Sequence, residues 1–78
     1  MKQIVFYETR VHYYGYTTIE TDAKFTKGSE IRKPDGMTLI VIATLPATHE
    51  NYLYAKKLLG YSGRHNGLST FKYNLERL

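Results

Sequence analysis

The sequence predicts a small α+β domain in which a sheet of four to five mostly antiparallel strands carries one helix on one face. Three observations support this prediction. Short stretches of β-branched and aromatic residues, which are typical of strands, recur through the first 45 residues. A run with helical spacing follows at 49–59, and an alternating stretch occupies 69–75. We expect the order β-β-(β)-β-α-β to form a single domain over residues 1–78.

The first two strands are expected at 3–7 (QIVFY) and 11–20 (VHYYGYTTIE). The position of the turn between them stays open, because residues 8–10 could form a hairpin or a bulge and Gly15 could instead mark a bend. Side chains alternate between the two faces of a strand. The odd-numbered residues are the expected core face of 11–20: Val11, Tyr13 and Ile19. The even-numbered residues are expected on the opposite face: His12, Tyr14 and Tyr16.

The motif KPDG at 33–36 predicts a tight turn, since proline suits the second position of a type I turn and Gly36 relaxes its exit. A short strand at 30–33 should therefore fold back onto a long strand at 37–45. The long strand is apolar on both faces, which one helix cannot cover. We expect the face around Ile40 and Ile42 to be covered by the 22–29 loop, by aromatic rings, by a partner, or by a second copy in a homodimer.

A helix is predicted at 49–59. Thr48 is a suitable N-cap, Glu50 favours the positive end of the helix, and Gly60 is expected to end it. The final strand, 69–75 (STFKYNL), places Phe71, Tyr73 and Leu75 on one face. The expected core contains ten residues: Val11, Tyr13, Ile19, Leu39, Val41, Leu45, Leu58, Leu59, Phe71 and Tyr73. His12, Tyr14 and Lys72 are expected to be more exposed.

The net charge of +4 lies entirely in the last third of the chain. Residues 1–50 contain six cations and six anions, whereas residues 51–78 contain five cations and one anion, giving 5 − 1 = +4. The five cations are Lys56, Lys57, Arg64, Lys72 and Arg77. This asymmetry fits ordinary solubility chemistry, or a site for an anionic partner, either nucleic acid or an acidic protein surface.

Two further features are candidate binding elements. Tyr14 and Tyr16, with Lys72 nearby, could form a surface on which bases stack, or could simply shield the sheet. The loop GYSGRHNG at 60–67 combines several glycine amides with Arg64 and His65, which suits an anion, although the same composition is ordinary for a surface loop.

Catalytic and metal-binding motifs are weak. His12, His49 and His65 lack metal-pair spacing, and the chain has no cysteine, so we expect no metal and no cofactor. The absence of cysteine is compatible with a reducing cytosol, and the longest apolar run, 39–43, is too short to span a membrane. We therefore expect a soluble cytoplasmic protein.

One resemblance bears on activity. The stretch KGSEIRKPDGMTLIVI, residues 27–42, resembles the central hairpin of the HicA-type toxins, small ribonucleases of double-stranded-RNA-binding-like fold. That family has a histidine just after its Gly-Ser, where this chain has Glu30, and it begins with a helix where this chain begins with strands. The ribonuclease activity is therefore not transferred to this chain.

These features predict a small basic, non-enzymatic binding protein that acts on nucleic acid or on a nucleic-acid-processing complex. An inhibitor of a host machine, of the kind that phages and mobile elements encode, fits this description. One alternative is a protein–protein interaction module that contacts no nucleic acid. A second is a small metal-independent ribonuclease. The expected binding residues are Lys56, Lys57, Arg64, His65, Lys72, Arg77, Tyr14 and Tyr16.

Overall fold

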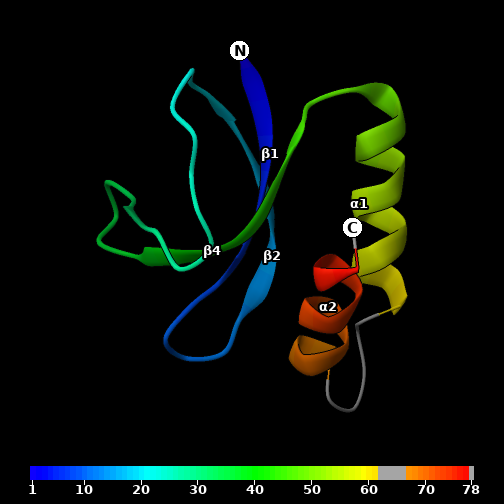
Figure 1. The fold of residues 1–78 in the computed structure, drawn as a ribbon. Helices are drawn as coiled ribbons and strands as arrows, with labels where there is room; N and C mark the ends of the chain where they lie inside the picture. Colours follow the sequence, from blue (N-terminus) through cyan, green and yellow to red (C-terminus); the bar gives the residue numbers. More distant parts are fainter. Residues whose placement is uncertain (62–66, 78) are drawn as a thin grey trace.

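The computed structural model describes residues 1–61 and 67–77, and it has an α+β fold (Figure 1). The strands are β1 (Lys2–Glu8), β2 (Tyr14–Glu20), β3 (Glu30–Arg32) and β4 (Thr38–Pro46). The helices are α1 (His49–Tyr61) and α2 (Gly67–Glu76). The strands form one antiparallel sheet in the order β2-β1-β4-β3. The predicted fold class is confirmed, with two helices instead of one.

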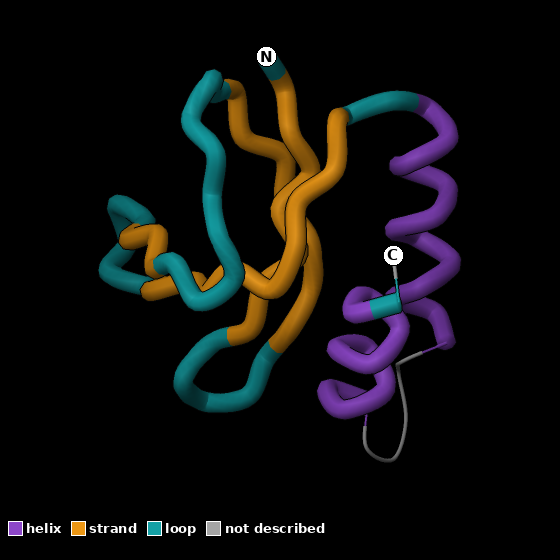
Figure 2. The backbone as a smooth tube through the Cα atoms, viewed as in Figure 1, coloured by secondary structure: helices purple, strands orange, loops and turns teal. Residues whose placement is uncertain are grey.

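Both helices lie on the same side of the sheet, and the connection that follows β2 begins on the other side (Figure 2). Its last residues return to β4, where Gly28 and Ser29 form backbone hydrogen bonds with Val41. The core between sheet and helices is formed by seven buried residues: Ile4, Phe6, Ile42, Ala55, Leu58, Phe71 and Leu75. No helix in the described parts of the chain is long and apolar enough to cross a membrane.

The turn between β1 and β2 occupies residues 9–13, so the second strand begins three residues later than predicted. The Thr9 amide donates to the Tyr13 carbonyl (2.8 Å), and the Tyr13 amide donates to Thr9 Oγ1 (3.1 Å). His12 adopts a left-handed conformation, with φ 67°. This geometry, which few non-glycine residues adopt, lets the chain reverse within five residues.

The predicted facing of the second strand is wrong. Val11 and Tyr13 are both 68% exposed in the turn, whereas Tyr14 and Tyr16 are half-buried against the core. A shift of one residue along a strand moves every side chain to the opposite face of the sheet. The position of the preceding turn decides which residues face the core. His12 is exposed, as predicted.

The hairpin that joins β3 and β4 confirms the prediction from KPDG. The Gly36 amide donates to the Lys33 carbonyl (2.9 Å), and the Met37 amide donates to Asp35 Oδ1 (2.9 Å). Gly36 has φ +91°, a conformation that glycine adopts without steric cost.

The helix α1 begins as predicted and ends one residue beyond Gly60. The Asn51 amide donates to Thr48 Oγ1 (3.2 Å), which confirms Thr48 as the N-cap.

The predicted final strand at 69–75 is wrong, because residues 67–76 form the helix α2. Its buried residues are spaced four apart: Gly67, Phe71 and Leu75. A spacing of four places side chains on one face both in a helix and in a strand, so Phe71 and Leu75 fit either structure. Tyr73 distinguishes the two, and it is 59% exposed on the outer side of the helix.

The remaining core predictions divide into two groups. Four of the predicted residues are buried: Leu39, Val41, Leu58 and Phe71. Three are half-buried: Ile19, Leu45 and Leu59.

The apolar residues of β4 are covered within the single chain. Ile42 belongs to the core under the helices, so the face around Ile40 and Ile42 is covered by the helix layer, which was not among the expected covers. On the opposite face Val5, Leu39 and Val41 are also buried. A homodimer was predicted because one apolar face of β4 was expected to need a cover. Neither face of β4 is left open, so this reason for a homodimer does not apply.

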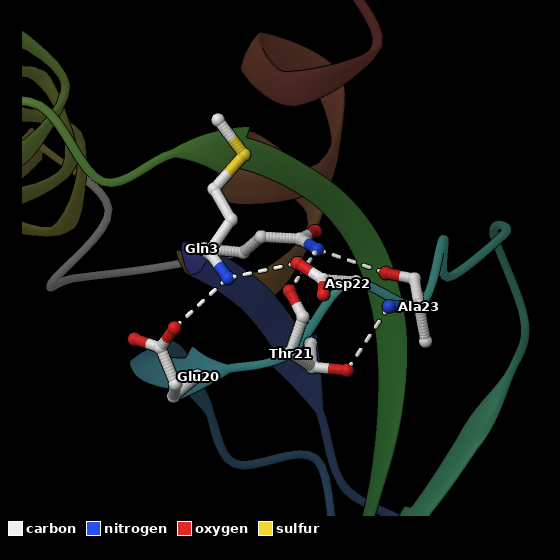
Figure 3. A network of polar contacts seen from close by, with 6 residues as sticks. Gln3, Glu20, Thr21, Asp22 and Ala23 are labelled. Atoms are coloured by element: carbon white, nitrogen blue, oxygen red, sulfur yellow. Dashed lines mark hydrogen bonds and ion pairs between the residues drawn. The ribbon is translucent and has the colours of Figure 1, made fainter.

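A polar network at the start of β1 holds the 21–29 connection in place (Figure 3). Gln3 Nε2 donates to the carbonyls of Thr21 (3.2 Å) and Ala23 (2.8 Å). The terminal ammonium of Met1 pairs with Glu20 (2.8 Å) and Asp22 (2.9 Å). These hydrogen bonds raise the pKa of the ammonium, and the ammonium lowers the pKa of Glu20.

Candidate functional site

The helix layer carries three of the predicted binding residues on its outer side. Lys56 and Lys57 are exposed on α1, and Arg77 is exposed just after α2. Within the described chain, no carboxylate forms an ion pair with Lys56 or Arg77. The positive charges of Lys56 and Arg77 are therefore available to a partner. The predicted residues Arg64 and His65 lie outside the described residues.

Arg77 and Tyr73 form a paired surface at the end of α2. The guanidinium of Arg77 lies 5.5 Å from the centre of the Tyr73 ring, as expected for residues four positions apart on a helix. Tyr73 as a whole remains 59% exposed. The unit joins a fixed positive charge to an accessible aromatic face. Sequence reasoning missed it because Tyr73 was assigned to a core strand, although the spacing of Leu68, Phe71 and Leu75 is also typical of a helix.

Lys72 is not available in the same way. Its ammonium pairs with Glu8 at 2.9 Å, and the two side chains are 38% and 20% exposed. The pair joins α2 to the end of β1. A neighbouring ion pair, Lys27 with Glu76 (2.9 Å), joins the far end of α2 to the 21–29 connection and lowers the pKa of Glu76. The first pair links α2 to the sheet, whereas the second, with side chains 62% and 53% exposed, links α2 to the connection and contributes little stability.

Tyr14 and Tyr16 do not form an open stacking surface. The Tyr14 ring lies 4.9 Å from the Phe71 ring, and the Tyr16 ring lies 6.2 Å from the Phe6 ring, measured between centroids. Both tyrosines are half-buried against the core. The Tyr14 ring fills space between β2 and α2, and the Tyr16 ring packs beside Phe6 of β1.

A second exposed group lies at the turn between β1 and β2. Val11 and Tyr13 project from it at 68% exposure each, while Thr9, which organises the turn, is 5% exposed. Arg10 in the same turn forms an ion pair with Glu30. This hydrogen-bonded turn displays one aromatic and one aliphatic side chain. Such side chains suit contact with a protein, because tyrosines are frequent anchors of protein interfaces.

The described hollows are small. One, of about 250 Å³, lies beside the first residue and is lined in part by Gln3, Asp22 and Lys24. Another, of about 190 Å³, lies between α2 and β4 beside the Lys72–Glu8 pair. Typical small-molecule sites occupy roughly 300–1,000 Å³. Among residues 1–61 and 67–77, no group of three or more His, Cys, Asp or Glu side chains could hold a metal ion.

Comparison with known proteins gives no assignment: the chain matches no protein-family model, no curated protein and no solved structure. Arguments about function therefore rest on the chemistry of the surfaces described above.

Proposed function

We propose that this chain is a small basic binding protein whose helix layer contacts nucleic acid, either free or within a complex that processes it. The observation that carries the proposal is the outer side of α1 and α2, where Lys56, Lys57 and the Tyr73–Arg77 pair are exposed. Cations bind phosphates regardless of base sequence, and an accessible ring can stack on a base.

The electrostatic part of this proposal can be tested by the salt dependence of binding. Fluorescence anisotropy with single-stranded and double-stranded oligonucleotides gives the slope of log affinity against log salt. Each neutralised phosphate contact should lower that slope by roughly 0.7–0.9. The double variant Lys56→Gln and Lys57→Gln should therefore lower it by roughly 1.4–1.8, twice the value for one contact.

The aromatic part needs a different variant. Tyr73→Ala should weaken single-strand binding and leave the salt slope unchanged, because a stacked ring releases no counterions. Lys33→Gln is the matched control for the lysine variants, since Lys33 is exposed in the β3–β4 turn, away from the helices (Figure 1). Absence of binding at low salt, or an equal effect of Lys33→Gln, would refute the proposal.

A second candidate function is a protein-interaction module without nucleic-acid contact. The exposed Val11–Tyr13 turn favours it, because it presents preorganised apolar side chains. For this function the exposed lysines would steer an acidic partner, and Lys56→Glu with Lys57→Glu should reduce the association rate more than it raises the dissociation rate.

A further inference from the structure

The two edges of the sheet differ in their protection against pairing with another strand. β3 forms one edge; it has three residues, two of them charged, and Pro34 follows it closely. β2 forms the other edge with seven residues, and its one charged residue is Glu20 at the end. Short length, charges and prolines are the usual protection of an edge strand, and β2 has little of it.

Two hydrogen bonds show which backbone groups of β2 point outward. The Thr9 amide donates to the Tyr13 carbonyl, and the Thr21 amide donates to the Met1 carbonyl, both within the β1–β2 register. In an antiparallel pair, hydrogen-bonded residues alternate with residues whose groups point away. The odd-numbered residues of β2 therefore bond to β1. The amides and carbonyls of Tyr16, Thr18 and Glu20 face the open edge.

The helix α1 leaves this edge accessible. Ala55 and Leu58 are buried and mark the side of α1 that faces the core. Tyr52 lies about 60° around the helix from Ala55, on the flank, and from there its hydroxyl reaches Thr18 Oγ1 at 2.9 Å. Thr18 and Glu20 are exposed. The flank of α1 thus stands beside β2 and does not cover its outer edge.

Lys56 lies on the same flank, one turn after Tyr52. The helix runs in the opposite direction to β2, because it turns back from the end of β4 (Figure 1). Lys56 is about 6 Å along α1 from Tyr52, and Tyr16 is about 7 Å back along β2 from Thr18. Lys56 therefore lies on α1 at about the level of Tyr16, and its exposed positive charge favours a carboxylate on an added strand at that level.

We propose that β2 pairs with β2 of a second copy, antiparallel about a two-fold axis at Thr18. In this register Thr18 lies opposite Thr18 of the second copy, and Tyr16 lies opposite Glu20. The outward groups form about six hydrogen bonds, two in each of three pairs. The two sheets become one continuous sheet, with the helices of both copies on the same face.

Side chains support a second copy as the occupant. On the face opposite the helices, Thr17 of one copy meets Ile19 of the other, a favourable pair of β-branched residues. On the helix face, Glu20 of one copy lies beside Tyr16 of the other, at the level of Lys56. The Glu20 side chain is 64% exposed, so it can accept this second cation beside its own terminal ammonium. The two Glu20 side chains lie at opposite ends of the paired strands.

The test is sedimentation equilibrium of the full chain from about 1 µM to 1 mM, a range that spans weak dimers. The wild-type chain should show a reversible monomer–dimer equilibrium. Thr18→Pro removes an outward amide without breaking the β1 ladder, and should raise the dimer Kd at least tenfold. Thr18→Val is the matched control: it also loses the bond to Tyr52 but keeps the amide, and should dimerise like the wild type.

A charge-exchange experiment tests the register. Thr18→Lys and Thr18→Glu should each be monomeric at concentrations where the wild type dimerises, because like charges would lie directly opposite each other. Their equimolar mixture should form a heterodimer that high salt dissociates.

Amide hydrogen exchange locates the surface. Protection of Tyr16, Thr18 and Glu20 should rise with protein concentration. A wild-type chain that stays monomeric up to 1 mM, a dimer that survives both Thr18→Pro and Thr18→Lys, or protection gained only on adding a foreign extended peptide would each overturn the proposal.

Discussion

Single threonine hydroxyls organise two chain reversals in this protein. Thr9 Oγ1 accepts from the Tyr13 amide in the β1–β2 turn, and Thr48 Oγ1 accepts from the Asn51 amide at the start of α1. The role of one threonine could be predicted from the sequence, and the role of the other could not. Thr48 follows a proline-containing segment and precedes a helical run, so its role was predictable. Thr9 acts through a turn that depends on a left-handed histidine, which no sequence rule specifies.

Thr48→Ala is expected to lower the free energy of unfolding by about 1 kcal/mol, because the first turn of α1 loses a hydrogen-bond acceptor. Urea denaturation followed by circular dichroism measures this change. Thr70→Ala is the matched control, since Thr70 is exposed within α2 and alanine favours a helix interior. An equal loss in both variants would show that the cap contributes nothing specific.

At the scale of elements, the strands, the KPDG hairpin and the first helix were predictable because each has a local signal. α2 was not, since Phe71 and Leu75 are spaced four residues apart and satisfy both periodicities. A strand at that position would also have needed a neighbouring strand in the sheet, and the sequence does not show whether a sheet edge is free to pair with it. The choice of helix decides whether Tyr73 is a core residue or an exposed ring.

A pair of substitutions distinguishes the two structures. Phe71→Ala should cost about 3–5 kcal/mol, because it empties a site in the core between α2 and the sheet. Tyr73→Ala should cost less than about 1 kcal/mol, the value of an exposed contact with Arg77. Chemical denaturation measures both. Large and similar losses would indicate that the two side chains share a buried strand face.

The candidate site was only partly predictable for the same reason. Lys56, Lys57 and Arg77 were identified because their charge is a property of composition and position. Tyr14 and Tyr16 were assigned to the face away from the core because the odd-numbered residues of a strand at 11–20 were its expected core face, and a single-residue shift exchanges the faces of a strand. Among the described residues, the most exposed rings are those of Tyr13 and Tyr73, which sequence reasoning placed in the core.

At the scale of the whole molecule, ion pairs decide which of the charges in the last third of the sequence remain available on the surface. Lys72 pairs with Glu8 of β1, and Glu76 pairs with Lys27 of the connection. Lys56 and Arg77 keep their charge on the outer side of the helix layer. The sheet side contributes different features: a protruding apolar turn and an open strand edge. A binding protein of this size can thus present a basic helical surface and associate through β2 at the same time.

The central claim is that the outer helix surface binds nucleic acid, and the most direct test is an amide-shift titration by NMR. The labelled protein is titrated at low salt with a single-stranded oligonucleotide. The account predicts that the shifted amides cluster on the outer side of α1 and α2: Lys56, Lys57, Tyr73 and Arg77. The β3–β4 hairpin around Lys33 should stay unchanged. A spectrum without shifts, or shifts centred on that hairpin, would contradict the claim.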